Sequence, residues 1–205
     1  MIYLVRHGET AHNRDGLGLG RADVELTELG RRQAAAVGER FATVRFDRVL
    51  SSPLQRARDV ADEIARRGDT EVEAVESLTE LDVGETEGML LGDVRTRFPE
   101  FLTTWASADG HLARMPGGES MDDLDRRIAS LVVQLVKDAE TAPTVVVSHN
   151  FVLRALLCRL LGLEVARFRS FELGLASVST IAVRNGRVHV GSVNDTCHLR
   201  SLNLA

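Results

Sequence analysis

Residues 1–10 read MIYLVRHGET, an apolar run that ends in a cation, an imidazole and a glycine. The run from Ile2 to Val5 predicts a short buried strand, and Arg6 and His7 follow at its carboxyl end. In an open α/β sheet, ligands bind in the crevice just beyond the carboxyl ends of the strands. The stretch therefore predicts an α/β fold in which Arg6 and His7 face a binding crevice rather than the core.

Strand-like and helix-like segments alternate along the rest of the chain, as in an α/β fold. Strands are expected at 46–51, 71–78 (an edge strand), 144–147, 178–183 and 187–193, and helices at 27–42, 53–67, 120–140 and 151–161. The β-branched run 144–147 is typical of a central strand buried on both faces. Asn185-Gly186 predicts a type I′ turn between the last two strands. Pro53 is expected in the first turn of its helix, and Ser120 is expected to cap the helix that follows it.

The composition fits one globular domain. The chain has 205 residues, of which 44% are hydrophobic and 27% are charged, so we expect a single domain over residues 1–205 with a substantial core. Residues 83–118 are rich in glycine, contain two prolines and hold only short apolar pieces, which predicts a lid-like excursion over one side of the sheet. Specificity is expected to reside there, with candidate substrate-facing side chains at Arg95, Arg97, Trp105, His111 and Arg114.

The charge and the cysteine content of the chain argue against some classes of partner and indicate a cellular compartment. The formal net charge of -5 argues against a dedicated nucleic-acid binder, because such domains usually carry a basic excess. Cys158 and Cys197 show neither a disulfide framework nor a metal-binding spacing, and we expect both as reduced thiols. The sequence lacks a secretory leader and any apolar stretch of roughly 18 residues, so we expect a cytoplasmic protein without membrane or nucleic-acid partners.

Polar side chains follow three of the predicted strands. Arg6 and His7 follow the first strand, Arg56 comes soon after the second, and His149 comes directly after the run 144–147. If these strands are parallel neighbours, two imidazoles and two guanidiniums converge on one crevice of an acidic protein. Guanidinium groups match phosphate oxygens in geometry and charge, so the crevice is expected to bind a phosphate dianion.

These residues belong to motifs that resemble the histidine phosphatase superfamily in order and spacing over nearly the whole chain. The motifs are Arg6 to Thr10 with Asn13, Ser51 to Ala57, Glu80 within 78–88, Pro116 to Ser120, and Val147 to His149. The segments 148–155, 167–171 and 194–199 resemble the small cofactor-independent phosphatases, which include phosphoserine, α-ribazole and broad-specificity phosphatases. The resemblance implies a phosphoglycerate mutase-like fold, a three-layer α/β/α sandwich with a mostly parallel central sheet.

The resemblance also implies a role for each matching residue. His7 matches the nucleophile that accepts the phosphoryl group, and Glu80 matches the proton donor. Arg6, Arg56 and His149 match the groups that hold the phosphate, and Asn13 matches a further contact. Additional binding residues are expected at Gly20, Arg21 and Asn150. The implied reaction is hydrolysis of a small phosphorylated metabolite, which releases inorganic phosphate and requires no metal or cofactor. A homodimer is left open.

Several alternatives remain at this point. Taken alone, His7 and His149 would fit structural histidines, and Glu80 is one acid among several neighbours. A metal site from both histidines and a carboxylate is conceivable, and so is a non-catalytic phosphate-binding module. A phosphoglycerate mutase is less favoured, because such enzymes carry Glu-Arg-His-Tyr-Gly around the acid where this chain reads ELDVG (residues 80–84). Arg21 is equally compatible with an exposed loop position, and Thr86 stands where the family usually has tryptophan.

Overall fold

A computed structural model describes residues 1–202 of the chain. The strands are β1 (Ile2–Arg6), β2 (Arg48–Ser51), β3 (Val72–Ala74), β4 (Thr144–Ser148), β5 (Val178–Arg184) and β6 (Arg187–Asp195). The α-helices are α1 (Ala11–Asp15), α2 (Glu28–Phe41), α3 (Gln55–Gly68), α4 (Leu91–Arg97), α5 (Pro99–Ala106), α6 (Met121–Asp138) and α7 (Asn150–Leu160). Short 3₁₀ helices lie at Glu76–Leu78, Gly84–Thr86, Val165–Ser170 and Cys197–Leu202.

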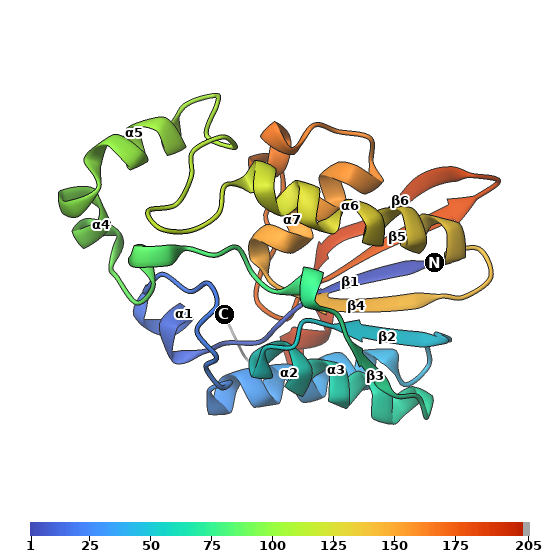
Figure 1. Cartoon of the computed structure of the whole chain (residues 1–205). Helices are drawn as coiled ribbons and strands as arrows, with labels where there is room; N and C mark the ends of the chain where they lie inside the picture. Colours follow the sequence, from blue (N-terminus) through green and yellow to red (C-terminus); the bar gives the residue numbers. More distant parts are fainter. Residues whose placement is uncertain (203–205) are drawn as a thin grey trace.

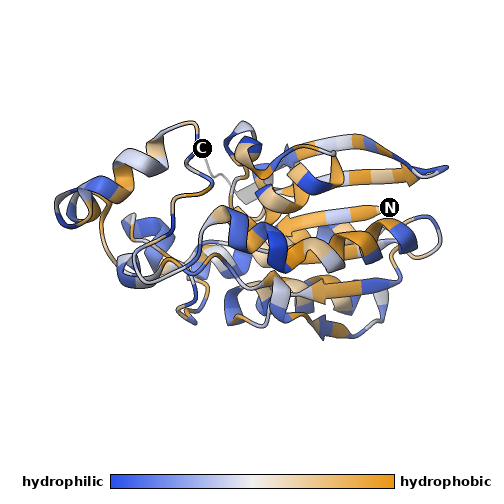
Figure 2. Cartoon of the chain, turned by 45° about the horizontal axis from the view of Figure 1, so that its top comes forward, coloured by the Kyte–Doolittle hydropathy of each residue, from blue (hydrophilic) through white to orange (hydrophobic). Residues whose placement is uncertain are grey.

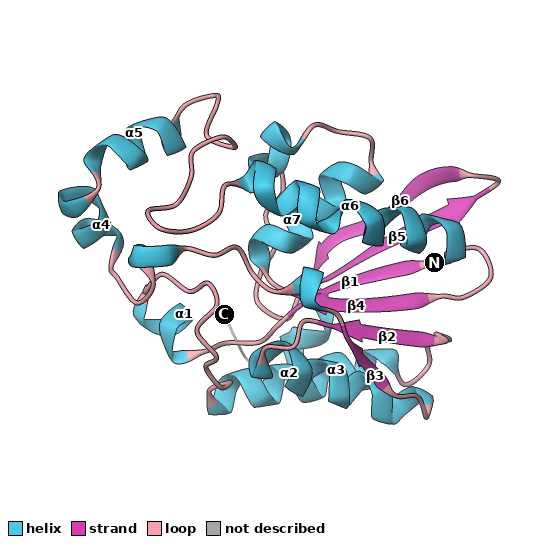
Figure 3. Cartoon of the chain, in the orientation of Figure 1, coloured by secondary structure: helices cyan, strands magenta, loops and turns pink. Residues whose placement is uncertain are grey.

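The strands form one mixed sheet in the order β3-β2-β4-β1-β5-β6 (Figure 3). β3, β2, β4 and β1 run parallel, whereas β5 and β6 are antiparallel to their neighbours. The mostly parallel sheet predicted from the sequence is therefore confirmed. The register pairs Arg6 with Ser148 and Ser51 with Val147, so the carboxyl ends of β1, β4 and β2 meet at one edge.

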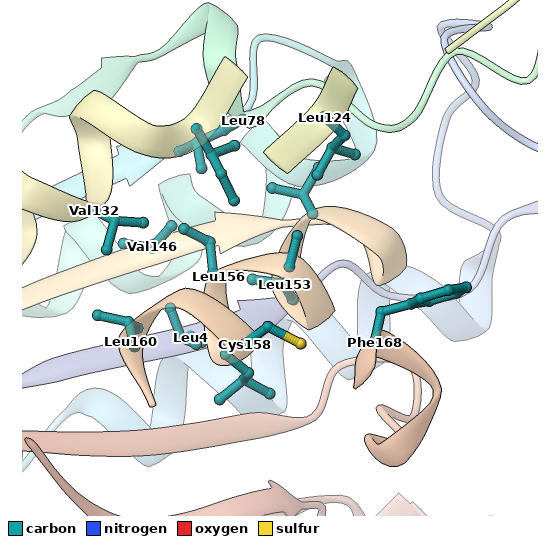
Figure 4. Packing of buried hydrophobic residues seen from close by; sticks show 14 of the residues in the cluster. Leu4, Leu78, Leu124, Val132, Val146, Leu153, Leu156, Cys158, Leu160 and Phe168 are labelled. Carbon is teal, nitrogen blue, oxygen red and sulfur yellow. The ribbon is translucent and has the colours of Figure 1, made fainter. Parts of the chain in front are cut away.

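Helices cover both faces of the sheet (Figure 1). On one face, α2 and α3 enclose a core that contains Val5 and Val147. On the other face, α6 and α7 pack over Leu4 and Val146 of the sheet, with Leu156 of α7 in the same core (Figure 4). Because successive strand residues point to opposite faces, a strand buried on both sides must be apolar throughout. The central strands are accordingly hydrophobic along most of their length (Figure 2), and the predicted three-layer sandwich is confirmed.

The helix caps and the hairpin follow local sequence rules. The Ser120 hydroxyl accepts from the amide of Asp123 at 3.1 Å, and the Asp123 carboxylate accepts from the amide of Ser120 at 2.9 Å, which completes a capping box at the start of α6. Asn185 and Gly186 have φ values of 52° and 69°, as a type I′ turn requires. The predicted cap and hairpin turn are both confirmed.

Two predicted boundaries are wrong. Pro53 does not lie in the first turn of α3, which begins at Gln55, because the amide of Ser52 still donates to Val147 of β4 at 3.0 Å and keeps the chain extended. The predicted edge strand 71–78 is only Val72–Ala74. Its partner β2 ends at Ser51, so the chain turns into a 3₁₀ helix after the last hydrogen bond between the two segments.

Residues 83–118 leave the sheet and carry α4 and α5, which lie apart from the three layers (Figure 1). An antiparallel bridge between Leu17 and Leu90 ties this segment to the loop after α1. In residues 1–202, no helix is long and apolar enough to span a membrane.

Candidate active site

His7 follows β1 directly, and its side chain is only 3% exposed. Its ring Nδ1 lies 2.7 Å from the carbonyl oxygen of Gly8. A carbonyl oxygen only accepts hydrogen bonds, so Nδ1 carries the proton and Nε2 keeps its lone pair. Burial, with Arg56 and Arg6 close by, lowers the pKa of His7 well below its ordinary 6.5. The imidazole is therefore neutral near pH 7, with Nε2 available to attack an electrophile.

His149 lies beside His7, with the two ring centres 5.1 Å apart. It is fully buried at the N-cap of α7, and its Nε2 lies 2.8 Å from the hydroxyl oxygen of Ser52. Its Nδ1 is buried and has no hydrogen-bond partner within residues 1–202. Burial, together with Arg56 and His7, lowers the pKa of His149 well below 6.5. Ser52 therefore orients a neutral ring whose second nitrogen is unpartnered within the described residues.

The buried guanidinium of Arg56 and the half-buried guanidinium of Arg6 complete the cationic part of the site. Arg56 on α3 is 0% exposed and donates to the carbonyls of Ala22 and Gly20, each at 2.7 Å. Arg6 donates to the carbonyl of Leu173 at 2.5 Å. The Nε atom of each arginine is buried without a partner in the described part of the chain. Burial lowers the pKa of Arg6 to about 10, so the side chain is still charged at neutral pH.

Glu80 reaches the same group of residues from the segment after β3. Its side chain is buried, and its carboxylate accepts from the amide of Leu81 at 2.8 Å and from the amide of Phe151 at 3.2 Å. Burial raises the pKa of Glu80 above its ordinary 4.5, although these amides and the charges of Arg56 and Arg6 oppose the rise. A carboxyl group of this kind can hold a proton in the pH range where its exposed counterparts have lost it.

Arg127 of α6 holds the backbone that carries Glu80, a role that the sequence did not reveal. Its guanidinium donates to the carbonyls of Ser77 and Thr79, each at 2.8 Å, and pairs with the carboxylate of Glu119 at 3.0 Å. The side chain is largely buried, at 20% exposure. Arg127 therefore fixes the approach of Glu80 without reaching its carboxyl group.

Glu87 is a second residue whose role the sequence did not reveal. Its carboxylate accepts from the amides of Gly20, Arg21 and Ala22 at 2.7, 2.9 and 3.1 Å. Three successive amides that converge on one anion form a rigid backbone nest. Glu87 thereby orders the loop whose carbonyls receive the hydrogen bonds of Arg56.

Arg21 and Asn13, two of the residues expected to bind substrate, have partners within the protein. Arg21 pairs with Asp82 at 3.4 Å and with Glu119 at 3.0 Å, so a role in substrate binding would require it to release both carboxylates. The side-chain oxygen of Asn13 accepts from the amide of Thr10 at 3.1 Å and caps α1. Its contact with phosphate stays a prediction.

Asn150 and Gly20 lie beside the central residues. Asn150 is the first residue of α7, and its side-chain oxygen is buried without a partner within the described residues. A Cβ at Gly20 would lie 2.7 Å from the carbonyl oxygen of Leu81. The loop can therefore approach the Glu80 segment only because this position is glycine. Among residues 1–202, no group of three or more His, Cys, Asp or Glu side chains is arranged to hold a metal ion.

The five residues with predicted central roles thus converge from four parts of the fold. Two guanidiniums bring positive charge, one neutral imidazole has a lone pair, and a buried carboxyl group with a raised pKa can hold a proton. Unpartnered nitrogens remain on Arg6, Arg56 and His149. Such a site can bind a dianion and compensate the charge that develops when a phosphoryl group is transferred.

Known proteins are similar to this chain in sequence and in fold. The pattern of the histidine phosphatase superfamily (branch 1) matches residues 2–196. Phosphoserine phosphatase 1 of Hydrogenobacter thermophilus is 34% identical over 198 residues, which cover 97% of this chain and 93% of that protein.

Solved structures of two relatives superpose on the fold. A histidine-to-alanine variant of the phosphoserine phosphatase from Entamoeba histolytica, in complex with phosphoserine, has a TM-score of 0.84 and 31% identity, covering 97% of this chain and 98% of that one. The α-ribazole phosphatase of Shigella flexneri has a TM-score of 0.86 and 28% identity, covering 95% and 96%. The family pattern covers almost the whole chain, and the residues that carry its motifs meet at one edge of the sheet: the protein belongs to branch 1 of the histidine phosphatase superfamily.

Proposed function

We propose that the protein is a metal-independent phosphomonoesterase, which acts as a single domain and transfers the phosphoryl group of a small metabolite to His7. The observation that carries the proposal is that a buried, neutral imidazole and a buried carboxyl group whose pKa is raised lie beside the same two arginines. Arg6 and Arg56 lie close to both groups. A nucleophile, an acid and a phosphate clamp together are more than phosphate binding alone would need.

In the first step, Nε2 of His7 attacks phosphorus and the bond from phosphorus to the ester oxygen breaks. Arg6 and Arg56 compensate the charge of the transferred oxygens, and protonated Glu80 gives its proton to the departing oxygen. The Gly8 carbonyl, which accepts from Nδ1 of His7, stabilises the positive charge that the ring acquires. The products of this step are a free alcohol and a phosphorylated His7.

In the second step, the carboxylate of Glu80 takes a proton from a water molecule, whose oxygen attacks phosphorus. The bond between phosphorus and Nε2 breaks, which releases inorganic phosphate and restores the neutral imidazole and the protonated acid. Glu80 therefore acts as acid and then as base, as a carboxyl group with a raised pKa can. The names of the relatives, which include phosphoserine and α-ribazole phosphatases, support this reaction class. A cytoplasmic location, where small phosphorylated metabolites are found, remains part of the proposal.

Release of inorganic phosphate from a panel of phosphomonoesters tests the function. The panel should include phosphoserine, phosphoglycerates, sugar phosphates, α-ribazole phosphate and aryl phosphates, compared by kcat/KM. We expect turnover by the wild type and its loss in His7→Asn. The exposed His189 of β6 provides the control, and His189→Asn should keep full activity. Full activity in His7→Asn would contradict the proposal.

The same assay separates hydrolysis from the two alternatives. A mutase would isomerise 3-phosphoglycerate faster than it releases inorganic phosphate. A non-catalytic phosphate-binding module would bind phosphate tightly and turn over no member of the panel.

A further inference from the structure

A cavity of about 280 Å³ lies between the 83–118 segment and the body of the protein. Its wall is formed by residues 16–19, the start of the 83–118 segment, α4, α5, Met115 and Phe151. No charged side chain lines it among the residues that the structure describes. The hydroxyl of Thr86, one of the polar groups in the wall, already donates to the carbonyl of Val83 at 2.8 Å.

Phe151 joins this cavity to the proposed reaction site. Its backbone amide donates to the carboxyl group of Glu80 at 3.2 Å, and the residue also lines the cavity. In the proposed reaction, the ester oxygen departs toward Glu80. The organic group bonded to that oxygen therefore lies on the Glu80 side of the phosphate, next to the wall that Phe151 provides.

Aromatic packing fixes the shape of the wall. Trp105 contacts Phe151 edge to face, with ring centres 5.8 Å apart, and contacts Phe101 at 5.7 Å. The guanidinium of Arg169 stacks on Trp105, 4.9 Å from its ring centre. Rings packed against each other in this way hold an apolar pocket open before a ligand arrives.

We propose that the cavity binds the alcohol portion of the substrate, and that this portion is apolar: an alkyl chain or an aromatic ring. This inference rests on the proposed function. A charged group placed in the cavity would lose its hydration without gaining a partner. An apolar cavity of about 150 Å³ holds benzene, so this one has roughly twice the volume that a single ring needs. A short polar alcohol such as serine would leave most of the cavity unfilled.

A series of straight-chain alkyl phosphates, from ethyl to hexyl, tests the proposal. The leaving alcohols have nearly equal basicity, so the chemical step stays constant while the apolar area changes. Burial of one methylene contributes about 0.8 kcal/mol, or roughly fourfold in binding. We expect kcat/KM to rise by about two- to fourfold with each added methylene until the cavity is full.

Two tryptophan variants test whether the preference for longer alkyl chains arises in the cavity. Thr86→Trp places a large ring into the cavity and should reduce the ratio of kcat/KM for hexyl over ethyl phosphate to about one. Leu112→Trp adds the same ring to the same segment at a position 56% exposed and outside the cavity wall, and it should keep the wild-type ratio.

The outcomes separate this inference from the function on which it rests. A kcat/KM that stays flat or falls from ethyl to hexyl phosphate, in an enzyme that hydrolyses ethyl phosphate, would overturn the apolar assignment and leave the phosphatase function intact. An equal loss of chain-length preference in Thr86→Trp and Leu112→Trp would also overturn it. Failure to release phosphate from every alkyl and aryl ester, while another member of the panel is hydrolysed, would overturn only the apolar assignment. Failure with every member of the panel as well would overturn both proposals.

Discussion

The carboxylate of Glu87 accepts a hydrogen bond from the amide of Gly20 at 2.7 Å, which joins the start of the 83–118 segment to the loop after α1. The carbonyl of the same Gly20 accepts a hydrogen bond from Arg56, also at 2.7 Å. The position of Arg56, which we propose binds phosphate, therefore depends on a carboxylate that the sequence motifs leave unassigned.

We expect Glu87→Ala to lower kcat/KM by about tenfold, because three amides of the loop that fixes Arg56 lose their common acceptor, and a tenfold change corresponds to about 1.4 kcal/mol. Steady-state kinetics with one aryl phosphate measures the effect. Glu85→Ala is the matched control, since Glu85 is 55% exposed and pairs with Arg97 at the surface. Such pairs contribute little, and its kcat/KM should stay within about twofold of the wild type. Equal losses in the two variants would refute the role of Glu87.

Arg127→Ala should lower the free energy of unfolding by about 3 kcal/mol, because the carbonyls of Ser77 and Thr79 lose a buried donor. Urea denaturation measures this change. The variant should also lose more kcat with alkyl than with aryl phosphates, since Glu80 is displaced and poor leaving groups need its proton most. Arg126→Ala removes the exposed neighbouring arginine and should change neither quantity appreciably. An equal loss of kcat with alkyl and with aryl phosphates would indicate a purely structural role for Arg127.

The pH profile of kcat/KM should follow two groups of the free enzyme. The reaction needs neutral His7, whose pKa is lowered by burial and by Arg56 and Arg6. The acid limb of the profile, where His7 becomes protonated, therefore lies at a pH below 6.5. It also needs protonated Glu80, whose pKa is raised by burial. The alkaline limb of the profile, where Glu80 loses its proton, therefore lies at a pH above 4.5. Glu80→Gln should remove the alkaline decline due to this group and leave the acid one. An unchanged alkaline limb in Glu80→Gln would exclude Glu80 as the acid.

Ser120→Ala should destabilise the protein by about 1 kcal/mol, because the first turn of α6 loses its N-cap. Thermal or urea unfolding measures the loss. Ser130 lies on an exposed part of the same helix, and Ser130→Ala should leave stability unchanged or slightly raise it, since alanine is the better helix former. Equal stabilities of the two variants would refute the cap as a source of stability.

The periodicity of the sequence was sufficient to predict most strands and helices, whereas the three layers and the mostly parallel sheet were predicted from the resemblance to the histidine phosphatase superfamily. Strand periodicity and strand ends are local signals, and Arg6, His7 and His149 stand directly after apolar runs. The insertion of β4 between β1 and β2 has no local signal, because it depends on pairing between segments far apart in the chain. The structure alone shows that these strand ends are neighbours.

The residues that position the site were missed for the same reason. Arg127 and Glu87 act on backbone groups 47 to 67 residues away, and no spacing rule marks such contacts. The wrong boundary at Pro53 has a similar origin, since the amide of Ser52 continues to pair with β4. Tertiary hydrogen bonds override the preference of proline for a first helical turn.

The account depends most directly on a phosphoryl group covalently bound to His7. A brief reaction with a radiolabelled phosphomonoester, stopped in alkali to preserve phosphohistidine, followed by peptide mapping, should place the label on the peptide that contains His7. The label should disappear after a chase with unlabelled substrate and should be absent in His7→Asn. Turnover by the wild type without any trapped label, or label on a peptide that lacks His7, would contradict the account.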